Sequence, residues 1–266
     1  MNTSKKTGII LKVKEKLALV KTLLEKKRMR QKERRFVVEG PHLVEEALEQ
    51  LDFVVHSEEL PVMQIIRQQG IEAFKVSHKQ FADLSEVETP QGILAVVKQR
   101  EFELRDVLTG PNPLAVFCLE VQDPGNLGTI IRTADAVAAS GVILSRGTVD
   151  LYNQKVIRST MGSLFHLPTV LVEDEDQTIA ELKKRKVKLV ATDIKAKKSY
   201  FEADLKGPTV ILVGNEGAGL PDEILKMADE TVSIPMPGKA ESLNVGISTA
   251  IILYEALRQR KNAGAN

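Results

Sequence analysis

The chain has little of what builds a disulfide-bonded, metal-binding or membrane protein. Its 266 residues include one cysteine, Cys118, four scattered histidines and no tryptophan. One cysteine excludes an internal disulfide and a cysteine-based metal cluster, and the histidines do not favour a zinc site, so we expect no metal. No apolar run reaches the roughly 18 residues of a membrane span, and the lysine-rich N-terminus lacks the pattern of a signal peptide. We therefore expect a cytoplasmic protein with no membrane partner.

A basic segment opens the chain. Residues 1–35 hold 13 Lys and Arg against 3 Glu, a net charge of +10, and because the whole chain carries +1 the remainder sums to −9. Lysine and arginine gain affinity for a polyanion by displacing counterions from its phosphates. This basic arm therefore indicates contact with nucleic acid, and the alternative is a solvated helix face.

Apolar patterning predicts two α/β units, residues 1–98 and 113–266, joined by a charged linker at 99–112. In the first unit we expect strands at 36–39, 53–56 and 93–97 and helices at 17–24, 41–51 and 62–69. In the second we expect strands at 114–121, 142–144, 188–191, 209–213 and 231–234 and helices at 127–139, 177–185, 222–227 and 243–258. Strands this continuously apolar are typical of a parallel sheet buried on both faces.

The first unusual segment of the second unit reads DPGNLGTIIRTADA and follows the strand at 114–121. Its glycines let backbone approach a ligand closely. Asn126 is a candidate cap for the helix that follows, and Arg132 lies on that helix. The alternative is an ordinary strand–turn–helix with a surface arginine.

The second segment, LVGNEGAGLP, has three glycines in six residues after a buried strand. It matches neither the dinucleotide fingerprint nor a P-loop, since no lysine is suitably placed. Ligands of open α/β sheets bind at the carboxyl ends of strands, so Gly214 and Glu216 are placed for a cofactor. A glycine-rich turn is the alternative, but a turn alone does not need a carboxylate.

The third segment, IPMPGKAESLNVGISTA, leads from a strand through a Pro/Gly loop into a helix that is apolar on nearly every face. Ser242 and Asn244 lie where that helix begins, and simple capping would account for either. A helix apolar all round is buried on more than one side, within a core or against another subunit.

In order, spacing and nearly every residue, these segments resemble the three signature motifs of the SpoU (TrmH) family of RNA 2′-O-ribose methyltransferases, of the SPOUT class. KVIRSTMGSLFHLP at 155–168 is also similar to the family. RRFVVEGPHLVEEAL and ETPQGILAVV resemble its auxiliary RNA-binding domain, a fold shared with some ribosomal proteins. One departure is Val137-Ala138, where many members have Phe-Gly.

The resemblance implies a SPOUT-type parallel sheet with a C-terminal deep trefoil knot, preceded by a small α/β RNA-binding domain. Residues 1–98 would bind the RNA substrate and 113–266 would form the methyltransferase domain. The resemblance implies three contacts to S-adenosylmethionine: Gly214, Ile234 and Leu243. It implies five catalytic-site residues: Asn126, Arg132, Glu216, Ser242 and Asn244.

The family's proposed base is the arginine at position 132. A guanidinium cannot accept a proton. We therefore expect Arg132 to stabilise the developing alkoxide or to bind a phosphate through two N–H donors. Both roles stay open, as does a purely capping role for Ser242. Glu216 and Asn244 would orient Arg132 and the loops.

The expected partner is structured RNA, above all 23S ribosomal RNA, because the N-terminal unit resembles ribosomal-protein modules. The alternatives are a tRNA target, a resistance methyltransferase acting on the same kind of RNA, and a non-catalytic RNA-binding assembly factor on the same fold.

A homodimer is also expected. Family members pair with active sites at the interface, where Arg132 of one subunit would serve the cofactor of the other. The C-terminal helix spreads apolar residues around its axis, namely Ile247, Ile251, Ile252, Tyr254 and Leu257. The alternative is that the knot and its neighbouring helices cover this helix within one chain.

Overall fold

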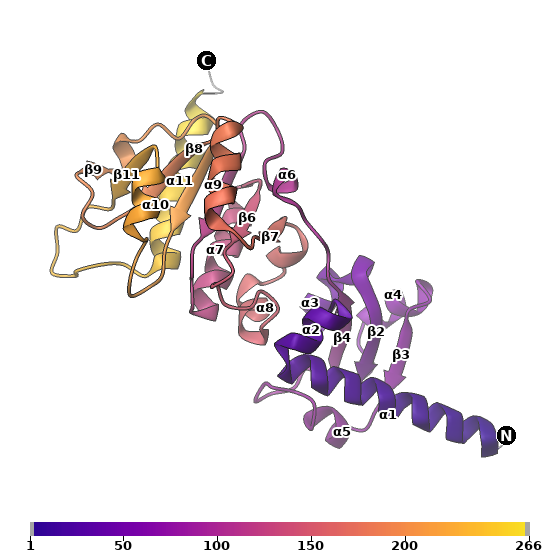
Figure 1. Cartoon of the computed structure of the whole chain (residues 1–266). Helices are drawn as coiled ribbons and strands as arrows, with labels where there is room; N and C mark the ends of the chain where they lie inside the picture. Colours follow the sequence, from indigo (N-terminus) through magenta and orange to yellow (C-terminus); the bar gives the residue numbers. More distant parts are fainter. Residues whose placement is uncertain (1–2, 264–266) are drawn as a thin grey trace. The chain divides into compact units, whose positions relative to one another are not determined.

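The computed structural model describes residues 3–263, with side chains from residue 11 onward (Figure 1). The chain divides into two compact units. Unit 1 contains the residues up to Arg100 together with Tyr152–Arg158, and unit 2 contains Glu101–Leu151 and the residues from Ser159 onward. No helix within the described residues is long and apolar enough to cross a membrane.

Unit 1 is built on a four-stranded sheet in the order β1-β4-β2-β3. Its strands are β1 (Arg35–Glu39), β2 (Leu51–His56), β3 (Glu72–Lys75) and β4 (Ile93–Lys98). β4 runs antiparallel to β1 and β2, whereas β2 and β3 are parallel. Its helices are α1 (Thr3–Glu25), α2 (Lys27–Glu33), α3 (Pro41–Glu46), α4 (Val62–Gln68) and α5 (His78–Ala82). A 3₁₀ turn (Leu48–Gln50) follows α3, so the helix expected at 41–51 ends earlier.

The basic N-terminal segment is part of this unit's core. Val20 and Leu23 of α1 are fully buried in the cluster that includes Phe53. The Nζ atom of Lys16 lies 4.1 Å from the centre of the Phe53 ring, in a cation–π contact. Arg30 is buried and donates from Nη1 to the Leu23 carbonyl (2.7 Å) at the end of α1. The arm is therefore a docked helix; the side chains of residues 1–10 lie outside those described.

The segment Tyr152–Arg158 completes unit 1 from far along the chain. β1 is an edge strand, and Gln154 donates from Nε2 to the Val37 carbonyl on it (2.8 Å). The Tyr152 ring lies 4.5 Å from the Phe36 ring, centre to centre. The linker expected at 99–112 is thus not the only place where the chain passes between units. That linker also holds a short helix, α6 (Leu104–Val107), whose Val107 is fully buried in the core of unit 2.

Unit 2 is a seven-stranded sheet in the order β7-β6-β5-β10-β8-β11-β9, and every pairing in it is parallel. The strands are β5 (Leu114–Cys118), β6 (Gly141–Leu144), β7 (Thr169–Leu171), β8 (Lys188–Thr192), β9 (Lys198–Ser199), β10 (Thr209–Val213) and β11 (Glu230–Ser233). Besides α6, its α-helices are α7 (Pro124–Ala136), α9 (Glu175–Lys184), α10 (Asp222–Met227) and α11 (Val245–Ala263). A further helix, α8 (Gln154–Thr160), begins within the segment that joins unit 1. The parallel sheet expected from the apolar strands is confirmed.

The strand order identifies where a ligand would bind. The chain moves outward from β5 through β6 to β7 and then crosses to β8, while β10 returns to lie between β5 and β8. Val213 of β10 pairs with Cys118 of β5, so the two strands end side by side. Crevices outside the carboxyl ends of parallel strands, at such a reversal of order, are where open α/β sheets bind ligands.

Candidate active site

Three loops leave the carboxyl edge of the unit 2 sheet. The first loop (residues 119–123) follows β5, the second loop (214–221) follows β10, and the third loop (234–244) follows β11 and leads into α11. They contain most of the sequence segments singled out as functional, and the helices α7 and α11 that follow them pack against each other.

The first loop ends in a helix cap that differs from the expectation. α7 begins at Pro124, and the Oδ1 atom of Asp123 accepts the backbone N–H of Asn126 (2.9 Å). Asp123 is thus the N-cap, and the prediction that Asn126 caps this helix is wrong. Proline suits the first helical position and aspartate the position before it. Asn126, displaced into the first turn, is buried.

The second loop is a small closed turn. Asn215 and Gly219 exchange backbone hydrogen bonds (3.1 and 2.9 Å), and the Oδ1 atom of Asn215 accepts the backbone N–H of Gly217 (2.9 Å). A Cβ atom on Gly214 would lie 2.3 Å from the Gly219 carbonyl oxygen. Glycine is therefore required at position 214 by the backbone of its own loop, whatever else approaches it.

Glu216, at the tip of this turn, holds the first loop. Its Oε2 atom accepts the backbone N–H of Gln122 (3.0 Å), and its Oε1 atom accepts those of Asp123 (3.0 Å) and of the Asn126 side-chain amide (2.8 Å). Partial burial by itself would raise the pKa of Glu216, but these hydrogen bonds favour the carboxylate and lower the pKa below its ordinary value. Glu216 is therefore ionised at neutral pH and acts as an anchor, because a weakly basic carboxylate with three donors is a poor general base.

Asn244 joins the third loop to the same network. Its Nδ2 atom donates to the Oδ1 atom of Asn126 (2.6 Å), and its own Oδ1 atom accepts the backbone N–H of Gly246 (2.9 Å) at the start of α11. Asn244 is thus both a helix cap and a tie between loops. Glu216, Asn126 and Asn244, which come from three distant segments, form one hydrogen-bonded chain that we call the loop tie.

Ser242 and Arg132 lie outside the loop tie. Both side chains are exposed, and neither makes a hydrogen bond or an ion pair with any side chain or backbone group that the structure describes. In this chain Glu216 and Asn244 therefore hold the loops and make no contact that would orient Arg132. Arg132 lies one turn beyond Thr129, which contacts α11 at Gly246.

The three expected cofactor contacts all lie at this edge. Gly214 opens the second loop, and Ile234 and Leu243 stand at the two ends of the third loop, each half-buried. The Glu216 carboxylate is linked through Asn126 to Asn244, the residue after Leu243. Partly exposed apolar side chains and a carboxylate at the same edge of the sheet suit a ligand that combines an aromatic base with a cationic centre.

Two residues that were not among the candidate site residues belong to the site: Gln122 and Asp123, whose backbone N–H groups are both accepted by Glu216. The Asp-Pro pair was the available signal, since aspartate before proline commonly starts a helix. Cys118, in contrast, is fully buried, and burial raises the pKa of its thiol, so it is not a thiolate nucleophile. Among residues 3–263, no group of three His, Cys, Asp or Glu is arranged to hold a metal ion.

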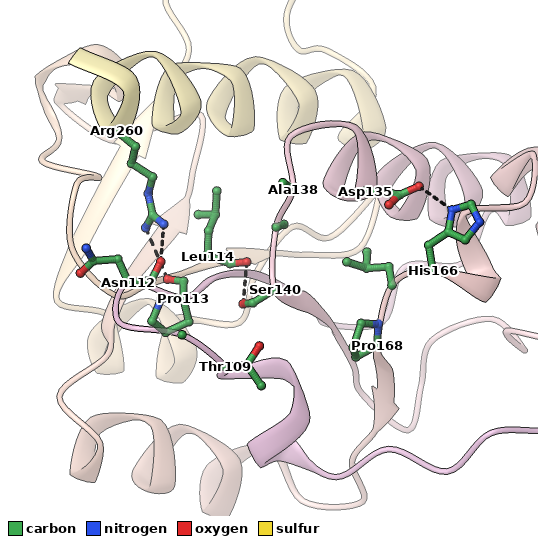
Figure 2. A pocket seen from close by; sticks show the side chains of 13 residues that line it. Thr109, Asn112, Pro113, Leu114, Asp135, Ala138, Ser140, His166, Pro168 and Arg260 are labelled. Atoms are coloured by element: carbon green, nitrogen blue, oxygen red, sulfur yellow. Dashed lines mark hydrogen bonds and ion pairs between the residues drawn. The ribbon is translucent and has the colours of Figure 1, made fainter. Parts of the chain in front are cut away.

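A cavity of about 410 Å³ lies at the opposite edge of the sheet, before β5, β6 and β7 begin (Figure 2). Figure 2 shows the Arg260 guanidinium turned toward the carbonyl oxygens of Asn112 (2.6 Å) and Pro113 (3.4 Å). His166 and Asp135 face each other at 3.3 Å. Because the Arg260 donors are already used by backbone carbonyls, and none of the motif loops reaches this edge, the cavity is not the candidate active site.

Comparison with known families matches both parts of the chain. The SpoU rRNA Methylase family model matches residues 113–254, and the model of the MRM3-like substrate binding domain matches residues 14–95. The first match contains all three loops of the carboxyl edge.

Individual proteins resemble the chain over most of its length. The 23S rRNA (guanosine(2553)-2′-O)-methyltransferase RlmP of Bacillus subtilis is 39% identical over 236 residues, 87% of this chain and 92% of RlmP. The SpoU methyltransferase AviRb of Streptomyces viridochromogenes, solved with AdoMet, has a TM-score of 0.85 at 32% identity and covers 92% of this chain and 98% of its own. An AdoMet-bound rRNA methyltransferase of Sinorhizobium meliloti has a TM-score of 0.83 at 35% identity, covering 91% and 94%.

Proposed function

The chain belongs to the SpoU rRNA methylase family, and on that premise we propose that it transfers a methyl group from S-adenosylmethionine to a ribose 2′-hydroxyl of 23S ribosomal RNA. The loop tie carries the proposal, because it joins the three family motifs into one structure at the ligand-binding edge of the sheet. RlmP, an rRNA enzyme by name, matches the chain across both units, which favours ribosomal RNA over tRNA.

The residues at the carboxyl edge fit S-adenosylmethionine. Ile234 and Leu243 offer partly exposed apolar surface for the adenine ring, and the Glu216 carboxylate is placed to favour a nearby sulfonium. Bound there, S-adenosylmethionine would supply an activated methyl group, which leaves the protein to align the 2′-oxygen and to favour its loss of a proton. The loop tie does the aligning, because it fixes the loops that would face the ligand.

Arg132 supplies the charge for this reaction. It is the exposed cation on α7, with no partner among the described residues, so its guanidinium is available to substrate. A guanidinium remains protonated, and it therefore stabilises negative charge developing on the 2′-oxygen or holds the adjoining phosphate through two N–H donors. Glu216 and Asn244 are positioning residues, and Ser242 stays a candidate for substrate contact.

RNA contact begins in unit 1 at a basic corner between α1 and α2. Four exposed cations there make no ion pair with the side chains that the structure describes: Lys26, Lys27, Arg28 and Lys32. Unpaired cations that share one corner are what a phosphate backbone binds. Arg30 is excluded from this role because its guanidinium caps α1.

A second copy of the chain would complete the site. α11 leaves Ile247 and Tyr254 half-exposed (50% and 53%), seven residues apart and thus on one side of the helix, whereas Ile252 is buried in the same chain. Such an apolar stripe is rarely left open in a monomer. Ile247 follows Gly246, against which Thr129 of α7 packs, and Arg132 is on the same helix as Thr129. We expect a homodimer in which Arg132 of one chain serves the loops of the other.

The remaining expectations belong with this function. We also propose a C-terminal deep trefoil knot, RNA binding by residues 1–98 with the methyltransferase domain at 113–266, and a cytoplasmic location. The test is to map 2′-O-methylation of ribosomal and transfer RNA in cells with and without the gene. Loss of one 23S site is expected. Loss of a tRNA site instead, or binding of S-adenosylmethionine without transfer to any RNA, would contradict the proposed reaction.

A further inference from the structure

The turn between β8 and β9 is closed by hydrogen bonds of Asp193. Asp193 donates its backbone N–H to the Val232 carbonyl (3.0 Å), and its own carbonyl accepts the N–H of Ala196 (3.1 Å). The Asp193 side chain accepts the backbone N–H of Lys195 (3.0 Å), so its carboxylate closes the turn. We call residues 193–197 the β8–β9 turn.

The side chains displayed by this turn lack partners. Ile194 is 72% exposed, more than any other large apolar side chain that the structure describes as exposed. Lys195 and Lys197 are also exposed, and neither forms an ion pair within the described part of the chain. The next lysine, Lys198, is by contrast paired with Glu230. The β8–β9 turn therefore presents two free cations around one uncovered apolar side chain.

Its position places the turn at the active-site edge. β8 lies between β10 and β11, whose carboxyl ends lead to Gly214 and Ile234. Thr192, the last residue of β8, donates from Oγ1 to the Leu212 carbonyl (3.1 Å), two residues before Gly214. A ligand bound to the second and third loops would therefore lie beside the β8–β9 turn.

Resting on the proposed function, we propose that the β8–β9 turn is an RNA contact within the catalytic unit. Lys195 and Lys197 bind phosphates of the single strand that flanks the target nucleotide, and Ile194 packs against the face of an unstacked base. RNA supplies both chemistries, a line of phosphates and flat apolar faces. The basic corner belongs to unit 1, whereas this turn lies in the catalytic unit and would position the strand next to the reacting atoms.

The experiment measures binding of an unmodified 23S rRNA transcript to the full-length protein at several salt concentrations. The test variant is Lys195→Ala with Lys197→Ala, and the matched control is Lys206→Ala. Lys206 is also exposed, but it precedes β10, at the opposite edge of the sheet. The test variant should bind several-fold more weakly, with a salt slope smaller by about 1.4, since each single-strand phosphate contact contributes roughly 0.7. The Lys206 variant should bind like the wild type.

Two further readouts make the assignment specific. Ile194→Ser should weaken RNA binding without changing the salt slope, because an apolar contact releases no counterions. Affinity for S-adenosylmethionine, measured by calorimetry, should stay the same in all variants. An equal loss in the Lys206 variant, or a loss of cofactor affinity in the lysine pair, would overturn the RNA assignment. Because RNA binding is measured without methyl transfer, a wild type that binds but never methylates would reject the proposed reaction alone.

Discussion

Replacing Glu216 by glutamine tests the loop tie directly. The carboxylate accepts three hydrogen bonds, one at Oε2 and two at Oε1. An amide has one acceptor oxygen. Its best orientation keeps the two hydrogen bonds donated by Asp123 and Asn126, and its NH₂ group then faces the N–H of Gln122, which loses its acceptor. One charge-assisted bond is lost and two become neutral. The first loop should then be released part of the time.

The size of the effect follows from the bonds. A hydrogen bond to a charged group contributes about 1.5–3 kcal/mol and a neutral one about 0.5–1.5 kcal/mol. Glu216 is largely exposed, and solvent screening favours the low end of these ranges. We expect a net loss of about 1–2 kcal/mol, which corresponds to roughly 5- to 30-fold weaker binding of S-adenosylmethionine. Glu216→Ala, which removes all three acceptors, should be weaker still.

Calorimetric titration measures this affinity, with Glu223→Gln as the control. Glu223 is an exposed glutamate on α10 and holds no loop. A double-mutant cycle with Asn126→Ala isolates the bond between the two side chains, and groups in direct contact should show a coupling of about 0.5–3 kcal/mol. Strictly additive effects, or a Glu216→Gln variant that binds cofactor like the wild type, would refute the loop tie as a determinant of the site.

Four further outcomes are expected. Arg132→Lys should retain cofactor affinity but lose about 10²–10³ in kcat in a methyl-transfer assay, because a point charge lacks the planar fork of donors; near-normal turnover would contradict the role. Since the pKa of Glu216 is lowered, cofactor binding should be intact above its ordinary value of 4.5 and fall as the pH drops through the lowered value, and titrating Glu216→Gln should show no such fall. Charge reversal at Lys27 and Arg28 should weaken RNA binding and reduce its salt slope by about 2, and an unchanged slope would make the corner mere solvated surface. Ile247→Asp should give a monomer by sedimentation, whereas a wild type that is itself monomeric and active would rule out the dimer.

The sequence pattern predicts well what depends on neighbours along the chain. Continuous apolar runs identify the parallel sheet of unit 2, and the strand Thr209–Val213 and the helix Asp222–Met227 have the expected bounds. Short or half-exposed strands are missed. In β3 (Glu72–Lys75) only one side chain is buried, and β7 (Thr169–Leu171) has three residues with the last exposed. Neither leaves a periodic apolar signal long enough to detect.

Contacts between distant segments are what the sequence could not show. It marks Glu216 and Asn126 as site residues by resemblance, but nothing in either segment says that one accepts a hydrogen bond from the other across 90 positions. Likewise, the glycine at position 214 indicates that some group lies too close for a side chain, but the sequence does not identify that group. The structure shows that it is the backbone of Gly219. Within the described residues of one chain Arg132 makes no hydrogen bond or ion pair with Glu216 or Asn244, so the expectation that they orient it stays a prediction.

The late segment that completes unit 1 has a consequence during synthesis. All four strands of that sheet have left the ribosome once Lys98 emerges, yet the residues that cover the edge of β1, Tyr152–Arg158, are made more than fifty residues later. In that interval the Val37 carbonyl, later bound by Gln154, belongs to an open strand edge, the kind of surface through which nascent chains pair with one another. Slow translation between these two points would therefore lengthen exposure to aggregation, and full protection of the N-terminal unit arrives only with a piece of the catalytic half.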